Sequence, residues 1–177
     1  RDLALDTLGD SLTGRTLQIA CAYGDLTNLL AERIAADGGK LDVVDVLEVQ
    51  TENLRGKLAP GLPVRLINMD SSDLDYDEAT FDRTLLFFLL HEQPEDVRRR
   101  TIAEALRVTR PGGKLVIVDY ARPYAWNPLR WLFQPVLARL EPFALDLWRN
   151  DLSAWTPPAW ADEASRPKRF FGGLYQM

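Results

Sequence analysis

Residues 17–29, LQIACAYGDLTNL, decide the fold of this chain. A short apolar run meets a small-residue turn at Gly24-Asp25, and leucines at helical spacing follow the turn. This order predicts a strand, a tight turn and a helix whose first free N–H groups point at a ligand. A second strand, residues 40–46, carries Asp45 near its end. Strand, turn, helix, strand and acid are together typical of a nucleoside-binding βαβ unit, in which the acid holds a ribose diol.

Length and composition limit the possible functions. The chain has 177 residues, which suits one domain with a sizeable core, and its net charge of −5 argues against a nucleic-acid-binding protein. One cysteine and one histidine exclude a disulfide framework, a cysteine-based zinc site and a multi-histidine metal site. No apolar run is long enough to span a bilayer and no signal peptide is visible, so we expect a cytoplasmic protein, with the inner face of the membrane as the alternative. Because the chain starts at Arg1 without a methionine, we expect a trimmed form of a longer protein.

Apolar runs and helical patterns alternate through the first two thirds of the chain. The predicted strands are residues 16–20, 40–46, 64–70, 81–90 and 114–119, and the predicted helices are residues 25–36, 48–58 and 94–107. This alternation with short links predicts an α/β fold, with a mostly parallel central sheet covered by helices on both faces. The run Arg98-Arg99-Arg100 is interpreted as a solvated face of the last of these helices.

The composition changes after Tyr120, because all five tryptophans lie within residues 126–160. Asn127-Pro128 predicts the start of a helix, and a second short helix is expected over residues 142–155. We interpret residues 120–160 as an aromatic lid or substrate segment of the same domain, and residues 169–176 as a closing strand. Peripheral membrane contact is the alternative for the aromatic segment, since arginines flank its apolar residues.

Five motifs follow one another along residues 16–119. They are LQIACAYGDLT, VVDV, NMDSSDL, TFDRTLLFFLLHE and RPGGKLVIVDY. In this order they resemble the class I S-adenosylmethionine-dependent methyltransferases, including the ubiquinone/menaquinone C-methyltransferases. This resemblance implies a Rossmann-like fold that binds S-adenosylmethionine.

A second set of motifs extends to the C-terminus. It consists of ACAYGD, LFFLLHE, VDYARPYAWNPL, LEPFALDLWRN and FFGGLYQ, and it resembles the methyltransferase-like rhodoquinone biosynthesis proteins. That resemblance implies an enzyme that replaces a ring methoxy of ubiquinone by an amino group, with S-adenosylmethionine as the amino donor and Mn²⁺ as an assisting metal. Ordinary methyl transfer to a small or prenylated aromatic is one alternative, and a degenerate domain without catalysis is another.

The resemblance also implies cofactor-binding positions. It places Asp45 and Val46 at the ribose, Asp70 and Ser71 at the adenine, Ala20, Tyr23 and Gly24 at the methionine end, and Phe88 and Leu89 beneath the cofactor. Gln18 stands where this superfamily usually has an acid at the end of the first strand. Cys21-Ala22 stand where the superfamily usually has glycines. Their side chains leave a ligand less room to approach the backbone.

Three residues are the candidates for catalysis. His91 follows the fourth predicted strand, and an ordinary histidine pKa of ~6.5 suits a general base at neutral pH; a histidine merely hydrogen-bonded in a turn is the alternative. Asp119 ends the fifth strand and is a candidate metal ligand together with His91, although two ligands do not complete a metal site. Tyr23 is a candidate for stacking on a substrate ring or for binding the carboxylate of the cofactor, and packing as a lid residue is its alternative.

Overall fold

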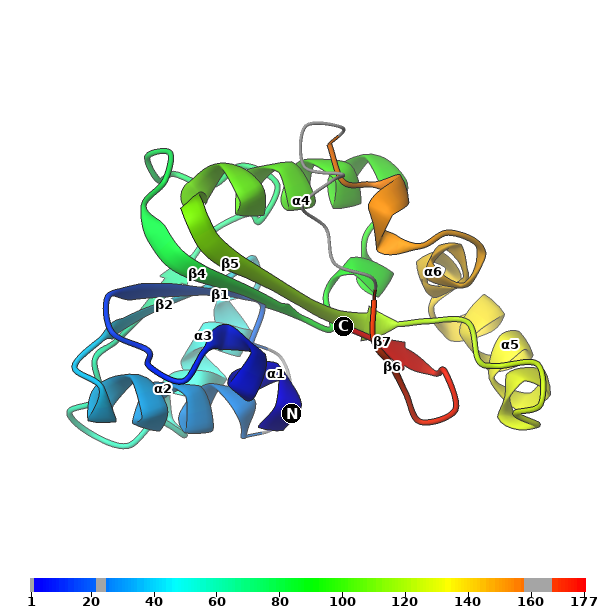
Figure 1. Cartoon of the computed structure of the whole chain (residues 1–177), viewed down its shortest axis with the longest axis horizontal. Helices are drawn as coiled ribbons and strands as arrows, with labels where there is room; N and C mark the ends of the chain where they lie inside the picture. The colour runs from blue at the N-terminus through cyan, green and yellow to red at the C-terminus, as the bar shows by residue number, and fades with distance from the viewer. Residues whose placement is uncertain (1, 22–24, 158–166) are drawn as a thin grey trace.

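The computed structural model describes residues 2–21, 25–157 and 167–177. Strands (β), α-helices (α) and 3-10 turns (η) follow one another along the chain. In order they are α1 (Asp2–Leu8), β1 (Arg15–Ile19), α2 (Leu26–Ala36), β2 (Lys40–Asp45), α3 (Glu48–Arg55), β3 (Val64–Asn68), β4 (Phe81–Phe87), η1 (Leu90–Glu92), α4 (Glu95–Val108), β5 (Thr109–Tyr120), α5 (Leu129–Leu140), η2 (Pro142–Leu145), α6 (Asp146–Arg149), η3 (Leu152–Ala154), β6 (Arg169–Phe170) and β7 (Tyr175–Gln176). Figure 1 shows a twisted sheet between helices, with α5 and α6 beyond one end of it.

Seven strands form one sheet in the order β3-β2-β1-β4-β5-β7-β6. Neighbours among β1 to β5 are parallel, whereas β7 is antiparallel to both β5 and β6. The chain builds β1, β2 and β3 outward in one direction and then returns to place β4 on the other side of β1. Open α/β sheets bind ligands at such a switch point, beyond the carboxyl ends of the strands. The predicted mostly parallel α/β fold is confirmed.

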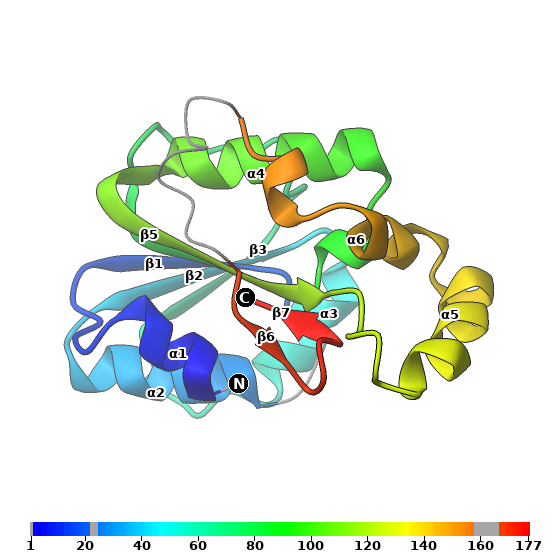
Figure 2. The same cartoon turned by 45° about the vertical axis from the view of Figure 1, so that its right-hand side comes forward.

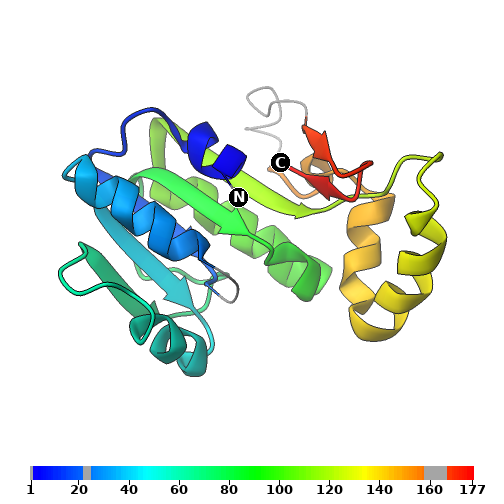
Figure 3. The ribbon, with the colours of Figure 1, turned by 90° about the horizontal axis from the view of Figure 1, so that it is seen from below.

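Helices cover both faces of the sheet. In Figures 2 and 3, α1 and α2 lie on one face and α4 lies on the other. Each face has its own apolar core: Leu30 and Val43 belong to the cluster under α1 and α2, whereas Val44 and Ile102 belong to the cluster under α4. Because Val43 and Val44 enter opposite cores, β2 is buried on both faces, as its apolar residues on consecutive positions predict.

Two strand boundaries differ from the prediction. The strand expected over residues 81–90 ends at Phe87, because Phe88 has a φ of +55° and the chain then enters η1. The turn expected at Pro111-Gly112-Gly113 lies inside β5, which begins at Thr109. Gly112 has a φ of +76°, so the chain bends there and then rejoins the ladder with β4.

The closing strand predicted over residues 169–176 is a hairpin made of β6 and β7. Its turn contains Gly172 and Gly173, with φ of +64° and +89°. A Cβ at Gly173 would lie 2.8 Å from the backbone nitrogen of Tyr124, so this turn requires glycine. The hairpin adds two strands to the edge of the sheet beside β5, where the sequence predicts one interrupted strand.

The C-terminal helical segment follows the prediction in part. Asn127 caps α5, since its Oδ1 accepts the N–H of Leu129 at 3.0 Å. The helix expected over residues 142–155 is divided into η2, α6 and η3. In the residues that the structure describes, every helix is too short or too polar to cross a membrane.

Candidate active site

Asp45 ends β2 at the carboxyl edge of the sheet. Its Oδ2 accepts the N–H of Cys21 at 3.0 Å, and its Oδ1 accepts the N–H of Leu47 at 3.0 Å. The side chain is 8% exposed, and the next residue, Val46, is 63% exposed. Asp45 therefore ties the turn after β1 to the turn after β2. A carboxylate has lone pairs beyond these two, which ribose hydroxyls can use.

Gln18 lies one residue before the end of β1 and beneath the first turn of α2. Its Nε2 donates to the carbonyl of Ala20 at 2.9 Å and to Oγ1 of Thr27 at 2.8 Å. Its Oε1 is buried and has no hydrogen-bond partner within residues 2–21, 25–157 and 167–177. A buried acceptor without a donor is unfavourable, and the amine of a bound S-adenosylmethionine would supply that donor. This orphaned oxygen fits the cofactor that the sequence motifs imply.

The turn after β1 has an uncommon backbone. Ala20 has a φ of +69°, a region that residues with a side chain seldom adopt and that is often found at functional sites. Burial and the neighbouring Asp45 raise the pKa of the Cys21 thiol to about 12, so Cys21 is a protonated packing residue. The predicted site residues Tyr23 and Gly24 lie outside the described residues.

The two residues that the motifs place at the adenine have different surroundings. Asp70 is exposed, and its Oδ1 accepts the N–H of Ser72 at 2.8 Å. Ser71 is buried, with its hydroxyl 3.0 Å from Oγ1 of Thr101 and 3.0 Å from Nε2 of Gln93. Ser71 therefore joins the loop after β3 to α4, whereas Asp70 stays at the surface.

Asp119 fixes the ring of His91. Its Oδ2 accepts the N–H of Leu90 at 2.7 Å, and its Oδ1 lies 2.9 Å from Nδ1 of His91. Because a carboxylate only accepts hydrogen bonds, Nδ1 carries the hydrogen and Nε2 is the basic nitrogen. The two residues that the sequence predicts for catalysis are thus in direct contact, and both are buried.

Glu141, just after α5, joins this cluster and was not predicted. Its Oε2 is buried, lies 3.6 Å from Nε2 of His91, and has no hydrogen-bond partner in the described part of the chain. Glu92 lies 3.8 Å from the same nitrogen. Burial lowers the pKa of His91, but the hydrogen bond and charge of Asp119, together with the charges of Glu141 and Glu92, outweigh it and raise that pKa. The only sequence signal for Glu141 is an acid at the end of an apolar helix.

Aromatic rings pack beside the histidine. The ring of His91 lies 4.6 Å from that of Tyr120, and the ring of Phe88 lies 5.6 Å from Tyr120 and 5.3 Å from Tyr175. Burial and nearby charges raise the pKa of Tyr120 to about 12. Leu89 packs against the apolar core under α4. Flat apolar rings beside a few polar groups are suited to binding an aromatic substrate.

Arg98 joins the histidine segment to the C-terminal segment. The interpretation of this arginine as part of a solvated face is wrong, because its side chain is fully buried. It donates to the carbonyls of Leu90 at 2.9 Å and Phe143 at 3.1 Å, and its guanidinium lies 4.5 Å from the ring of Trp155. Arg98 therefore holds η2, which follows Glu141, against η1, which contains His91.

The donor set around His91 does not fit a metal ion. The two oxygens of Asp119 already accept N–H groups, since Oδ2 accepts that of Leu90 and Oδ1 accepts those of Tyr120 and of Nδ1 of His91. Across the part of the chain that the structure describes, no group of three or more His, Cys, Asp or Glu side chains could hold a metal. The predicted pair His91 and Asp119 is therefore better suited to proton transfer than to metal binding.

The sequence matches one protein family and several individual methyltransferases. Residues 16–113 match the family described as methyltransferase domain. The chain is 31% identical over 112 residues to a ubiquinone/menaquinone biosynthesis C-methyltransferase of Idiomarina loihiensis, covering 62% of this chain and 43% of that protein. It is 29% identical over 168 residues to a demethylmenaquinone methyltransferase of Renibacterium salmoninarum, covering 92% and 67%. For four such relatives, the chain spans only 42% to 51% of their own length.

Solved structures match the fold. A SAM-dependent methyltransferase from Aquifex aeolicus has a TM-score of 0.61 at 18% identity, covering 99% of this chain and 85% of that one. The N-methyltransferase NodS from Bradyrhizobium japonicum, solved with S-adenosyl-L-homocysteine, has a TM-score of 0.58 at 23% identity, covering 68% and 58%. At these identities the likeness concerns the fold alone.

Proposed function

The chain belongs to the methyltransferase-domain family of S-adenosylmethionine-dependent enzymes, and from this premise we propose that it transfers an amino group to a prenylated quinone. Ubiquinone would be converted to rhodoquinone. A carbon–nitrogen bond forms between the amine of S-adenosylmethionine and the ring carbon that carries a methoxy, and that methoxy leaves as methanol. The nitrogen would stay on the ring as an amino group when its bond to the α-carbon of the methionine part breaks by elimination: the bonding pair goes to nitrogen, which takes up one proton, while a proton leaves the neighbouring β-carbon and its electron pair forms a carbon–carbon double bond in the released sulfonium product.

Gln18 is the observation that carries this proposal. An amine that attacks a ring must be neutral, and a carboxylate beside it would stabilise the ammonium form and raise the pKa of the amine. Gln18 presents an uncharged buried acceptor, Oε1, that has no partner among the described residues. It can therefore orient the amine without holding it in the charged form.

His91 supplies a base for the proton that the amine loses. Asp119 holds Nδ1, which leaves Nε2 to accept a proton. The rings of Phe88 and Tyr120 lie 6.2 and 4.6 Å from the ring of His91 and offer apolar surface on which a quinone ring could pack. Because the donor set does not fit Mn²⁺, the proposal contains no metal step.

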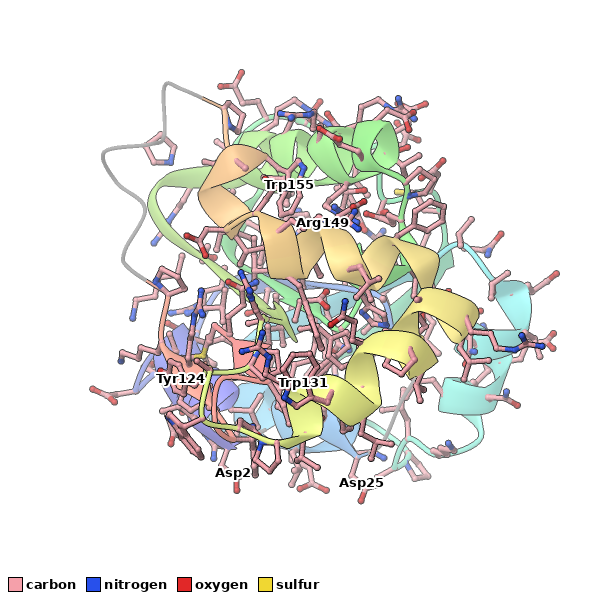
Figure 4. All side chains as sticks on the ribbon, turned by 90° about the vertical axis from the view of Figure 1, so that its right-hand side faces the viewer. Asp2, Asp25, Tyr124, Trp131, Arg149 and Trp155 are labelled. Carbon is pink, nitrogen blue, oxygen red and sulfur yellow. The ribbon has the colours of Figure 1, made fainter. Side chains whose placement is uncertain are left out.

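Peripheral membrane contact is part of the proposal, since a polyprenyl quinone resides in the bilayer. Trp126 and Trp131 are 74% and 69% exposed, and Leu132 and Leu140 on α5 are 62% and 71% exposed. Figure 4 shows Trp131 at the end of the molecule where α5 faces outward. An exposed aromatic and leucine-rich helix of this kind suits the interface of a membrane.

Ordinary methyl transfer to a quinone is the second candidate. The names of the relatives favour it, since several of them are quinone C-methyltransferases at about 30% identity. Both reactions would use S-adenosylmethionine bound at the carboxyl edge of the sheet. They differ in the group that moves to the quinone, which is the amino nitrogen in one and the methyl group in the other.

The mass of the product separates the two reactions. Incubation of the purified protein with S-adenosylmethionine and ubiquinone should give a quinone lighter than the substrate, because an amino group weighs less than a methoxy. A parallel incubation contains a demethylated quinone in place of ubiquinone. A heavier quinone there, with release of S-adenosylhomocysteine and no lighter product from ubiquinone, would support methyl transfer and contradict amino transfer.

A further inference from the structure

A pocket lined by cations lies in the C-terminal segment. Its volume is about 200 Å³, and its lining residues are Arg122, Arg130, Gln134, Leu145, Trp148 and Arg149. The three arginines come from three parts of the chain: the segment after β5, α5 and α6. Figures 1 and 3 show α5 and α6 side by side at this end of the molecule. We call this site the arginine pocket.

The positive charge of the arginine pocket is hardly compensated. Arg122 and Arg130 have no ion-pair partner in residues 2–21, 25–157 and 167–177, and Arg149 has Asp146 at 3.4 Å. The guanidinium of Arg130 instead lies 4.7 Å from the ring centre of Trp131. Like charges that converge on one pocket repel each other, and a bound anion would relieve this repulsion.

Trp148 adds a neutral donor to the same pocket. Its Nε1–H is buried and has no acceptor among the residues that the structure describes. A buried N–H without an acceptor is unfavourable. An oxyanion in the arginine pocket would supply acceptors both for this N–H and for the guanidinium groups.

We infer that the arginine pocket binds the phosphate of an anionic phospholipid. Guanidinium groups match phosphate oxygens in bidentate geometry, which favours phosphate over a small spherical anion. The source follows from α5 itself: Trp131 adjoins Arg130, whose guanidinium lies 4.7 Å from its ring, and is 69% exposed, and Leu132 is a further exposed apolar residue of the same helix. Arginines beside exposed tryptophans and leucines place a phosphate site at the headgroup level of a bilayer. This inference rests on the membrane contact proposed above and gives it lipid selectivity.

Vesicle binding with matched charge variants tests the inference. The protein is sedimented with vesicles of phosphatidylcholine alone and of phosphatidylcholine mixed with phosphatidylglycerol. One double variant, Arg130→Gln with Arg149→Gln, removes two charges from the pocket. The control, Arg100→Gln with Arg139→Gln, removes two charges from exposed positions outside it. We expect the native protein to prefer phosphatidylglycerol vesicles, and the pocket variant to lose at least about tenfold more affinity than the control.

Three results would overturn the inference. Equal losses in both double variants would mean general electrostatic attraction rather than a built site. Equal binding to both kinds of vesicle would exclude selectivity for anionic lipid. Calorimetric binding of glycerol phosphate to the pocket, without preference for phosphatidylglycerol vesicles, would identify a soluble phosphate as the ligand.

Quinone product formation and vesicle binding test the proposed function and the lipid site independently. Selective vesicle binding through the pocket, combined with no lighter quinone product, would contradict amino transfer and support the lipid site. A lighter quinone product from a protein without lipid selectivity would overturn the lipid site alone.

Discussion

At the scale of single residues, the charge at position 18 separates amino transfer from methyl transfer. Gln18→Glu should suppress amino transfer and leave cofactor binding intact or tighter, because a carboxylate stabilises the ammonium form of the amine. Loss of the Nε2 donor to Ala20 and Thr27 should lower the free energy of unfolding by about 1 kcal/mol. Turnover is measured from about pH 6 to about pH 9, the range in which a perturbed amine titrates. S-adenosylhomocysteine affinity of the same variant separates lost chemistry from lost folding, and native turnover across this range would refute the role given to residue 18.

Asp45 provides a second prediction at this scale. Asp45→Ala should weaken S-adenosylhomocysteine binding by about 1.5–3 kcal/mol, the scale of hydrogen bonds to a charged group. The matched control is Asp73→Ala, since Asp73 is an exposed acid of a nearby loop. Calorimetry on both variants checks the prediction, and equal affinities would show that Asp45 does not hold the ribose. Chemical unfolding of the Asp45 variant measures the separate loss of the hydrogen bonds to Cys21 and Leu47.

At the scale of elements, α4 anchors the loop after β3 through Glu104. Its carboxylate accepts the N–H of Leu74 at 2.9 Å and pairs with Arg107 at 2.7 Å. The hydrogen bonds from Arg107, with that from Leu74, outweigh burial and lower the pKa of Glu104. A carboxyl pKa that is lowered by folding stabilises the protein above the unfolded pKa, about 4.3, and this stability is lost as pH falls through the lower folded value.

Glu104→Gln tests that anchoring. At neutral pH it should lower the free energy of unfolding by about 1–2 kcal/mol, and the difference from the native protein should shrink as pH falls below about 4. Urea unfolding at several pH values measures it. The control Glu95→Gln removes an exposed pair with Arg99 and should change stability by less than about 0.5 kcal/mol. A difference from the native protein that does not depend on pH would contradict the ionic role of Glu104.

The sequence predicts the elements of the sheet better than it predicts their ends. Apolar residues cluster in each of β1 to β4, so these strands can be located without a structure, although polar residues interrupt every one of them. Their ends depend on single dihedral angles, such as the positive φ of Phe88, which ends β4 early. The sequence predicts one strand where the structure has the hairpin after residue 168, because Gly172-Gly173 indicates an irregularity without distinguishing a bulge from a turn.

The candidate site could be predicted where it lies at a strand end or, as for His91, a few residues after one. Asp45 and Asp119 follow apolar runs, so their place at the carboxyl edge follows from the parallel sheet. Glu141 and Arg98 have no such signal. Glu141 comes near His91 through the packing of η2 on η1, and Arg98 is buried because its guanidinium binds carbonyls from both segments. Contacts of this kind depend on tertiary packing between segments far apart in sequence.

At the scale of the whole molecule, the carboxyl edge of the sheet and the aromatic segment, residues 120–160, have different proposed roles. The edge of β1 and β2 presents Gln18 and Asp45. On the other side of β1, β4 leads into η1, which contains His91, and β5 beyond it carries Asp119. The segment after β5 brings Glu141 to the histidine and also carries the exposed tryptophans. One segment thus connects the proposed site of chemistry with the proposed membrane surface.

The central claim is that the amino nitrogen of S-adenosylmethionine, and not its methyl group, moves to the quinone. The most direct test uses S-adenosylmethionine labelled with heavy nitrogen at its amine in one sample and with heavy carbon at its methyl in another. The account predicts that the quinone product carries the nitrogen label and lacks the carbon label. A quinone that carries the methyl label, or a nitrogen label that stays entirely with the methionine-derived product, would contradict it.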